Sequence, residues 1–449
     1  MNSDFSRRKF LQATGLAGSL IATRSILLET PAFALPTNVG PNDHIRFGII
    51  GVGMQGQGLL RGAVALPGLE CVGACDLYDG RHTLAKEIAG ANLPTTRRYQ
   101  DLLNDKRVDA LIIAVPDFWH RKLVVEAVNA GKDVYCEKPM SHNVADGFAM
   151  VDAVKKTGRI MQVGSQRTSS SVYKKAQELY QQGAIGDLLL IELYQGRNEP
   201  SGAWEYPPPL DLSPSNLDWD TWLSDTPKRP FNPEVFARWR CWKEYGTGVA
   251  GDLMVHLLSG MQFITGINQT PTRATAIGGI FRWKDGRDMP DVHTVLFNYG
   301  ETPVYVRLTL GTETPEAIRL MGSKGILEVS GGTITHIPQT GRDSSPSYYS
   351  LSFPNAMRAE YTKEWHAKND PPVGQELVNE NVVYKGTDST DDVKPHLWTF
   401  FECVRSRKVP PQDVVFGHHA AAACHMANES YFRKQTVYLD EASRTIKAV

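Results

Sequence analysis

Three shortages narrow the possible functions before any motif is considered. The 449-residue chain has only six cysteines, at positions 71, 75, 136, 241, 403 and 424, with no C-x-x-C pair and no metal-ligand spacing. Its 48 basic and 49 acidic residues nearly cancel, which leaves no electrostatic signature of a nucleic-acid or anionic-membrane partner. After residue 34 no uncharged apolar run is long enough to cross a bilayer. We therefore expect buried, unpaired cysteines, no metal, no nucleic acid and no membrane span.

Residues 1–34 have the pattern of an export leader. Ser6-Arg7-Arg8-Lys9-Phe10-Leu11 is a twin-arginine motif, a modest apolar stretch runs over 16–28, and Ala32-Phe33-Ala34 offers small residues to a signal peptidase. A disordered basic N-terminus or a short membrane anchor are the alternatives, but Arg24 and Glu29 interrupt the apolar stretch. We predict a leader outside the fold, cut after Ala34, and a periplasmic protein that folds before export by the twin-arginine route.

The central motif is a glycine-rich turn between a predicted strand and a predicted helix. The apolar run 45–50 is typical of a buried parallel strand, and residues 57–66 have helical character. Glycines in a G-x-G-x-x-G turn allow a tight bend, close approach of a pyrophosphate and packing of helix on strand. The motif alone is a weak signal, but this context favours dinucleotide binding. The predicted cofactor contacts in the turn are Gly51, Gly53, Met54, Gln55 and Gly56.

A second predicted strand, over residues 69–75, is followed by Asp76. Asp76 lies about 20 residues past the last glycine, where a carboxylate meets the ribose 2′-hydroxyl of NAD. Because a carboxylate repels a 2′-phosphate, the sequence favours NAD over NADP. Arg81 is close enough to make that preference moderate, so NADP stays possible.

Strands and helices alternate from residue 44 to residue 165. The run 110–115 is an uninterrupted apolar strand, and further strands are expected at 133–136 and 160–163. A helix at 121–130 precedes the first of these two strands, and a helix at 144–156 precedes the second. This order predicts an α/β fold that begins with a doubly wound, parallel Rossmann sheet over 44–165.

The pattern changes after residue 166. Segments 292–297 and 304–308 alternate with period two, and a hairpin surrounds residues 322–325. They predict a second α/β domain over 166–440, with a large open, mainly antiparallel sheet that is covered on one face. We expect residues 341–392 to form a long loop, and helices at 395–406 and 417–434 to close the chain.

Two loops follow strands of the Rossmann sheet at the edge where ligands bind. The first is Pro116-Asp117-Phe118-Trp119-His120 and the second is Cys136-Glu137-Lys138-Pro139-Met140. Glu137-Lys138-Pro139 can also be read as a polar surface turn. Its place beside the bound nicotinamide instead favours a lysine that moves or donates a proton.

A third loop, at residues 245–251, contains three glycines and leads into a predicted helix with Asp252 and His256 four residues apart. Residues at this spacing project from one face of a helix. An ordinary N-cap for Asp252 and a core histidine for His256 are the alternatives.

Together these features resemble the Gfo/Idh/MocA oxidoreductase family. The resemblance rests on G-x-G-x-x-G with Asp76, on Glu137-Lys138-Pro139, on Asp252-x-x-x-His256 and on the passage 163–167, and it extends from about 44 to 440. It implies that Lys138 and His256 handle the proton of a sugar hydroxyl while Asp252 orients or tunes them. It also implies a substrate-binding and oligomerising second domain, and hence a dimer or tetramer. Many members have aspartate three residues after the motif histidine, where this chain has Ser259.

The full predicted site follows from these motifs. The catalytic residues are Lys138, His256 and Asp252, and the cofactor contacts outside the glycine turn are Asp76, Pro116, Asp117, His120, Glu137, Lys138 and Gln166. The predicted reaction is hydride transfer between bound NAD(P) and a hydroxyl or keto group of a sugar, polyol or glycoside, with the cofactor held tightly. Two alternatives stay open: an NAD-dependent glycosidase that works by transient oxidation and elimination, and a non-catalytic, cofactor-bound sugar sensor.

Overall fold

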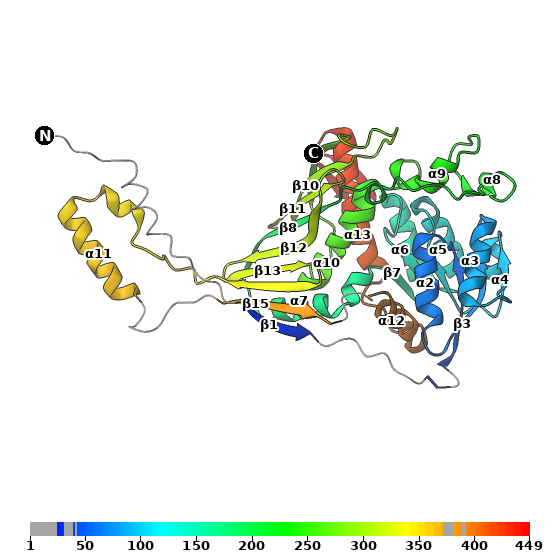
Figure 1. Cartoon of the computed structure of the whole chain (residues 1–449), viewed down its shortest axis with the longest axis horizontal. Coiled ribbons are helices and arrows are strands. Elements are labelled where there is room, and N and C mark those ends of the chain that lie inside the picture. The colour runs from blue at the N-terminus through cyan, green and yellow to red at the C-terminus, as the bar shows by residue number, and fades with distance from the viewer. Residues whose placement is uncertain (1–24, 31–38, 41–42, 371–379, 388–391) are drawn as a thin grey trace.

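The computed structural model describes residues 25–30, 39–40, 43–370, 380–387 and 392–449. The twin-arginine motif and the predicted cleavage site at Ala34 lie outside these ranges. Within them the chain forms two sheets, a six-stranded sheet at one end of the molecule and an eleven-stranded sheet beside it (Figure 1).

The six-stranded sheet is a Rossmann sheet, as predicted. Its parallel strands lie in the order β4-β3-β2-β5-β6-β7. β2, the first of these strands in the sequence, therefore lies in the middle of the sheet. The strands are β2 (Ile45–Ile50), β3 (Leu69–Cys75), β4 (Thr95–Thr96), β5 (Ala110–Ile113), β6 (Asp133–Glu137) and β7 (Met161–Gly164). The helices that connect them are α2 (Met54–Val64), α3 (Asp79–Ala89), α4 (Tyr99–Asn104), α5 (His120–Asn129) and α6 (Val144–Thr157). β5 and β6 are buried along their whole length because helices cover both faces of the sheet.

The second sheet is mixed and mainly antiparallel, in the order β1-β15-β14-β13-β12-β8-β11-β10-β9-β16-β17. Its strands are β1 (Ser25–Thr30), β8 (Leu188–Gly196), β9 (Arg273–Gly279), β10 (Val292–Tyr299), β11 (Thr302–Thr309), β12 (Thr314–Gly322), β13 (Gly325–Ser330), β14 (Thr333–Pro338), β15 (Asn381–Gly386), β16 (Val437–Asp440) and β17 (Thr445–Ala448). Only the β8–β11 and β1–β15 pairs are parallel. The predicted strands at 292–297 and 304–308 and the hairpin at 322–325 are confirmed.

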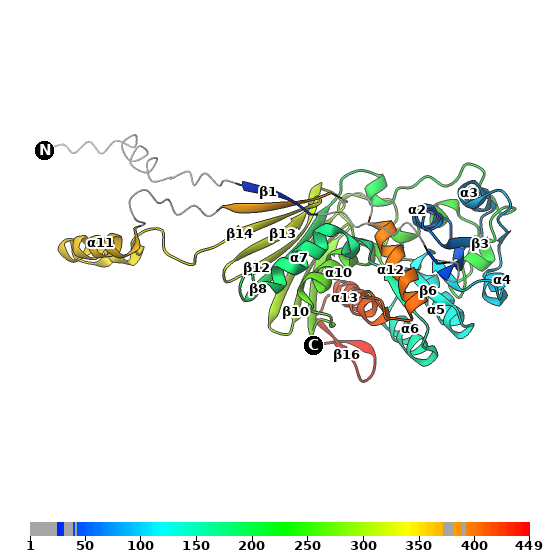
Figure 2. The ribbon, with the colours of Figure 1, turned by 90° about the horizontal axis from the view of Figure 1, so that it is seen from below.

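Three helices cover one face of this second sheet: α7 (Ser171–Gln181), α10 (Val255–Thr265) and α13 (Val414–Arg433) (Figure 2). Their apolar side chains and those of the inner sheet face form the largest core of the molecule. On the opposite face Leu296 and Ile277 are exposed. The alternation of buried and exposed residues along β10 follows from this one-sided covering.

The two predicted C-terminal helices are confirmed as α12 (Val393–Ser406) and α13. α12 packs on the Rossmann end of the molecule, where Phe401 contacts Phe47 of β2. α13 contacts both α6 and β9, so it bridges the two sheets. The predicted domain boundaries stay a prediction, but residues far beyond 165 complete the core around the Rossmann sheet.

The prediction of a long loop over 341–392 is wrong. This part of the chain contains α11 (Asn355–Asn369) and β15 (Asn381–Gly386), and together with the short turn Tyr348–Ser352 the helix forms an arm beyond the ends of β14 and β15 (Figures 1 and 2). No residue of α11 is buried. The polar, Pro- and Ser-bearing composition obscured both elements, because α11 has only a narrow apolar stripe, Met357, Tyr361 and Trp365, and β15 depends on its neighbours for pairing.

The prediction that residues 1–34 lie outside the fold is also corrected. Residues Ser25–Thr30 form β1, which pairs in parallel with β15 at the edge of the second sheet. Thr30 hydrogen-bonds through Oγ1 to Ser171 Oγ at 2.8 Å, and Thr387 Oγ1 donates to the Thr30 carbonyl at 2.7 Å. This strand pairs with residues more than 350 positions away, so local sequence could not indicate it.

Candidate active site

The glycine turn has the geometry that its spacing predicts. α2 begins at Met54, three residues earlier than expected, so its first turn follows Gly53 directly. Gly51 has φ +88°, and a methyl group there would overlap the carbonyl of Ala114. A methyl group at Gly56 would overlap the carbonyl of Gly51. Only glycine therefore allows α2 and the turn to pack this closely, and the N-terminus of α2 is left facing the cavity.

Asp76 lies at the end of β3 with its carboxylate directed at the glycine turn. Its Oδ2 accepts from the backbone N–H of Val52 at 2.8 Å, and its Oδ1 accepts from the backbone N–H of Tyr78 at 3.1 Å. Arg81 Nη1 forms an ion pair with Asp76 Oδ2 at 3.4 Å. The acid predicted to favour NAD and the cation predicted to moderate that preference are thus in contact.

A cavity of about 580 Å³ opens from the glycine turn toward the second sheet. Most predicted site residues line it: Gly53, Met54, Gln55, Pro116, Asp117, Glu137, Lys138, Gln166, Asp252 and His256. A smaller adjoining cavity is lined by Gly51, Asp76 and Pro116. The carboxyl ends of β2, β3, β5 and β6 therefore meet the start of α10 at one site.

Lys138 and Asp252 are in direct contact across the two halves of the molecule. Lys138 Nζ donates to Asp252 Oδ1 and to the Asp252 carbonyl, both at 2.9 Å. Arg240 Nε donates to the same Oδ1 at 3.1 Å, and Trp204 Nε1 donates to Oδ2 at 3.1 Å. Burial opposes ionisation of Asp252, but Lys138 and Arg240 outweigh it and hold the pKa of this carboxyl well below its usual range. Asp252 is therefore an anion that positions its neighbours.

His256 lies beside this ion pair. Burial, reinforced by the positive charges of Lys138 and Arg167, lowers the pKa of His256 well below its ordinary value of 6.5. The imidazole is therefore neutral near pH 7 and able to accept a proton. Lys138 uses two of its three N–H groups on Asp252, which leaves one donor. A substrate hydroxyl between Lys138 and His256 would meet a donor and an acceptor.

The local backbone at this point differs from the expected ordinary helix start. Residues Ala250–Met254 form a π-helical turn before α10 begins at Val255. Such turns are rare and frequent at functional sites. Asp252 and His256 both line the cavity on either side of this change in helical geometry.

Glu137 and Asp117 serve mainly to hold the loops in place. Burial raises the pKa of each carboxyl. Glu137 accepts from Gln55 Nε2 at 3.2 Å and contacts Gln166 Nε2, while Asp117 accepts from Thr247 Oγ1 at 2.7 Å. The Glu137 bonds connect the glycine turn to the Glu137-Lys138-Pro139 loop, and the Asp117 bond connects the loop at 116–120 to the Thr247 loop. The second bond links the Rossmann side of the cavity to the loop that precedes α10.

His120 does not line either cavity, contrary to its predicted place among the cofactor contacts. It is fully buried, with Nδ1 2.8 Å from the Pro139 carbonyl and Nε2 3.0 Å from the Val115 carbonyl. Its side chain connects the two strand-end loops from beneath. The sequence placed it in the right loop, but its direction depended on the packing of α5.

Trp204 belongs to a tryptophan-rich passage whose rings suit either a sugar face or the core, and the sequence did not single out Arg240 or Arg197. Three residues outside the predicted set therefore also shape the site: Trp204, Arg240 and Arg197. The first two contact Asp252, and Arg197 and Arg240 line the cavity. All three belong to the Pro- and Trp-rich passage between β8 and α10, in which no single motif stands out. A tryptophan or arginine has many possible roles, and only the fold brings these three to Asp252.

The segment 199–245, which we call the strap, crosses from the second sheet to the Rossmann end (Figure 1). It contains the short helices α8 (Trp219–Trp222) and α9 (Pro233–Ala237). Asp218 N–H donates to the Leu77 carbonyl at 3.0 Å, and Trp119 Nε1 donates to the Trp222 carbonyl at 2.9 Å. Strap residues Tyr206, Pro207, Trp222, Phe236 and Trp239 line the main cavity. The strap therefore encloses the site where a dinucleotide fits.

Among the described residues no group of three or more His, Cys, Asp or Glu side chains is placed to hold a metal ion. In the same part of the chain no helix combines the length and apolarity that a membrane crossing requires. The six cysteines are unpaired, five of them buried and Cys71 partly so.

The fold and the cavity define a dinucleotide-binding protein with a second α/β domain. Family models identify it further: residues 45–165 match the oxidoreductase family's NAD-binding Rossmann fold, and residues 222–328 match the GFO/IDH/MocA C-terminal domain. The chain therefore carries the NAD-binding and C-terminal domains of the Gfo/Idh/MocA family. The resemblance seen in the motifs is thereby confirmed at the level of both domains.

Comparison with individual proteins gives shorter matches in sequence. The chain is 34% identical to an inositol 2-dehydrogenase of Salmonella typhimurium over 149 residues, which is 33% of this chain and 44% of the relative. It is 26% identical over 181 residues, 40% of this chain and 52% of the relative, to an inositol 2-dehydrogenase/D-chiro-inositol 3-dehydrogenase of Lactiplantibacillus plantarum. The matched stretch thus spans about half the length of these curated relatives.

Solved structures share the fold over nearly the whole chain. A levoglucosan dehydrogenase in complex with NADH and levoglucosan superposes with a TM-score of 0.62 at 17% identity, covering 89% of this chain and 100% of that one. An aldose-aldose oxidoreductase from Caulobacter crescentus, complexed with glycerol, gives 0.61 at 17% identity, with coverage of 88% and 100%. At this identity the likeness concerns the fold.

Proposed function

We propose that the protein is a nicotinamide-dependent oxidoreductase that transfers hydride between bound NAD(P) and a hydroxyl or keto group of a sugar, polyol or glycoside. One observation carries the proposal. Lys138, held by Asp252, and a neutral His256 lie in the cavity that the glycine turn also lines. A cofactor seated on the turn would have a proton donor and a proton acceptor beside its reactive end.

In the proposed mechanism the cofactor supplies hydride chemistry, and the residues of the chain position the substrate and move its proton. Lys138 donates a hydrogen bond to the reacting oxygen, and His256 takes the hydroxyl proton during oxidation. Asp252 keeps Lys138 and Arg240 charged and oriented. Polyol oxidation is supported by the similarity of the chain to inositol 2-dehydrogenases.

The test is an assay of NAD reduction with purified protein and a panel of inositols, aldoses and glycosides, with product analysis. Hydride transfer to or from a sugar or polyol supports the proposal. Glycoside cleavage without net NAD turnover supports the transient-oxidation alternative. Sugar binding without either reaction would identify a sensor.

We further propose that NAD is the preferred cofactor, that it is bound tightly beneath the strap, and that the protein is exported by the twin-arginine route. The strap's contacts to Leu77 and Trp119 support tight binding, because they must open before a dinucleotide can leave. We also propose a dimer or tetramer, supported by the exposed Ile277 and Leu296 on the outer face of the second sheet and by the unburied arm of α11. Light scattering of the purified protein tests this last proposal, and a monomer would contradict it.

A further inference from the structure

The side chains that line the main cavity include one more basic residue than acidic residues. The basic side chains that line the whole cavity are Arg81, Lys138, Arg167, Arg197 and Arg240. The acidic ones are Asp117, Glu137, Asp252 and Asp392. The pairing of these groups decides where the excess lies.

Most of these charges are matched in places away from the substrate. Arg81 pairs with Asp76 at the cofactor end, and Arg167 pairs with Glu316. Asp392 lies on the Arg167 side, where both residues also line a second, smaller cavity. Glu137 lies near Lys138 and Asp117 near Arg240: burial raises the pKa of each carboxyl, and the charge of the neighbouring cation opposes that rise.

The remaining acid, Asp252, is shared by two cations. Lys138 and Arg240 both donate to the same oxygen, Oδ1, while Oδ2 accepts from the neutral indole of Trp204. Lys138 and Arg240 are therefore both paired with an acid, and the neighbouring His256 is neutral.

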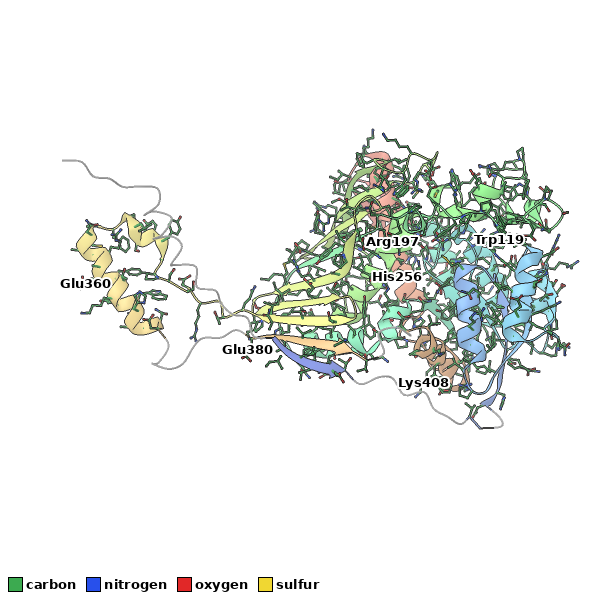
Figure 3. All side chains as sticks on the ribbon, viewed as in Figure 1. Trp119, Arg197, His256, Glu360, Glu380 and Lys408 are labelled. Atoms are coloured by element: carbon green, nitrogen blue, oxygen red, sulfur yellow. The ribbon has the colours of Figure 1, made fainter. Side chains whose placement is uncertain are left out.

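Arg197 is the basic side chain of this end of the cavity that has no ion pair among the described residues. It follows the last residue of β8, and its backbone N–H donates to the Thr309 carbonyl at 2.9 Å, which holds its position. Its half-buried side chain lines the cavity near His256 (Figure 3). In the described part of the chain no carboxylate or other acceptor is paired with its guanidinium. A guanidinium that lines the cavity without an ion pair can bind an anionic group of a ligand.

The dinucleotide does not supply that charge here. Its pyrophosphate belongs at the glycine turn and the N-terminus of α2, at the other end of the cavity. The nicotinamide ring is neutral or positive. The anion that complements Arg197 would therefore come with the substrate.

We propose that the substrate is an anionic sugar or polyol, whose carboxylate or phosphate is bound by Arg197 with support from the Lys138–Arg240 pair. This inference rests on the proposed function and names its substrate class. A guanidinium binds either anion through two parallel hydrogen bonds, which fixes the sugar's orientation as well as its charge. The reacting hydroxyl then lies toward Lys138 and His256.

The test compares matched neutral and anionic probes on the NAD-loaded protein. Glucose, glucuronate, gluconate and glucose 6-phosphate are titrated by calorimetry and assayed for hydride transfer. We expect an anionic probe to bind at least about 10-fold more tightly than glucose at low salt, with the difference shrinking as salt rises. The anionic probe that binds most tightly shows whether the cavity prefers a carboxylate or a phosphate.

Variants at Arg197 distinguish the effect of its charge from the effect of its packing. Arg197→Gln should weaken the anionic probe by about 10- to 100-fold and leave glucose nearly unchanged, whereas Arg197→Lys should retain part of the preference. Arg107→Gln, at an exposed turn far from the cavity, is the matched control and should have no effect. Melting curves establish that each variant is folded.

The outcomes for the substrate class and for the activity are distinct. Equal binding of glucose and the anions, or an equal loss of both in Arg197→Gln, overturns the anionic substrate. Selective anion binding without hydride transfer keeps the substrate class and overturns the proposed activity. Hydride transfer with neutral sugars alone keeps the proposed activity and overturns the anionic substrate.

Discussion

Lys138 and Asp252 are 114 residues apart in the sequence, yet Lys138 Nζ lies 2.9 Å from Asp252 Oδ1. One residue comes from the end of a Rossmann strand and the other from the π-helical turn before α10. The ion pair therefore joins the cofactor half of the cavity to the substrate half. It fixes a lysine beside a neutral histidine, and this arrangement is the basis of the catalytic predictions.

Removing Lys138 should impair catalysis more than folding. Lys138→Ala is expected to lower turnover by about 10²- to 10⁴-fold, because it removes the donor to the reacting oxygen. Cofactor affinity, measured by fluorescence titration, should change far less. Lys86→Ala on α3 is a control outside the cavity. Wild-type turnover in Lys138→Ala would contradict the catalytic role and favour the alternative that Lys138 belongs to an ordinary polar surface turn.

His256 should determine the acid limb of the pH–rate profile. His256→Ala should lower oxidation by about 10²- to 10⁴-fold. In the wild-type enzyme the lowered pKa keeps the imidazole neutral, so kcat/KM should stay high as pH falls through 6.5 and decline only at lower pH. Arg167→Gln removes one of the charges that lower this pKa, so its acid limb should move to higher pH.

The stability of the folded protein should also fall at acidic pH, because its buried histidines have lowered pKa values. A histidine whose folded pKa is below its unfolded pKa of about 6.5 contributes stability above that pH and loses it as pH falls toward the folded value. Burial also lowers the pKa of His293 and of His396 to about 4. Thermal melts should therefore show falling stability from pH 6.5 to pH 4, and a flat profile over this window would contradict the burial of neutral histidines.

Cofactor choice should depend on the Asp76–Arg81 pair. Asp76→Ala should weaken NAD binding, by about 1–3 kcal/mol, and narrow the gap to NADP, because a charged acceptor for the ribose is lost. Arg81→Ala should instead widen the preference for NAD, because the cation near a 2′-phosphate is removed. Dissociation constants of both cofactors for the three proteins provide the measurement. Tighter binding of NADP by the wild type would refute the role given to Asp76.

The protein should be purified with its cofactor. Free dinucleotides are scarce outside the cytoplasmic membrane, so an exported enzyme needs NAD that it takes up while folding and resets within its own cycle. We expect near-stoichiometric nicotinamide to be released on denaturation. Trp119→Phe removes the hydrogen bond to the strap at Trp222 and should speed cofactor loss. An empty site with weak, freely exchanging NAD would exclude this mode of operation.

The N-terminus offers a separate test of export. If the leader is cut after Ala34, the exported protein begins at residue 35 and lacks β1, so β15 becomes the edge of the second sheet. Intact mass measurement of periplasmic protein should show this start. Changing Arg7 and Arg8 to lysine should keep the protein in the cytoplasm at full length. Periplasmic protein that retains residues 25–30 would show that β1 belongs to the mature fold.

The sequence by itself determined the Rossmann sheet, the glycine turn and the alternating strands of the second domain. These features rest on local signals: apolar runs, period-two alternation and the need for glycine at Gly51 and Gly56. The loops that carry Asp117, Glu137 and Lys138 could also be placed, because parallel strands end at one edge of a sheet.

Only the tertiary structure decided which side chains meet in the site. Arg240 and Trp204 reach Asp252 because the strap folds over the cavity, and His120 turns inward because α5 packs where it does. β1 and β15 likewise exist through pairing across more than 350 residues. Contacts of this kind depend on the whole fold, since neither partner has a local pattern that indicates the other.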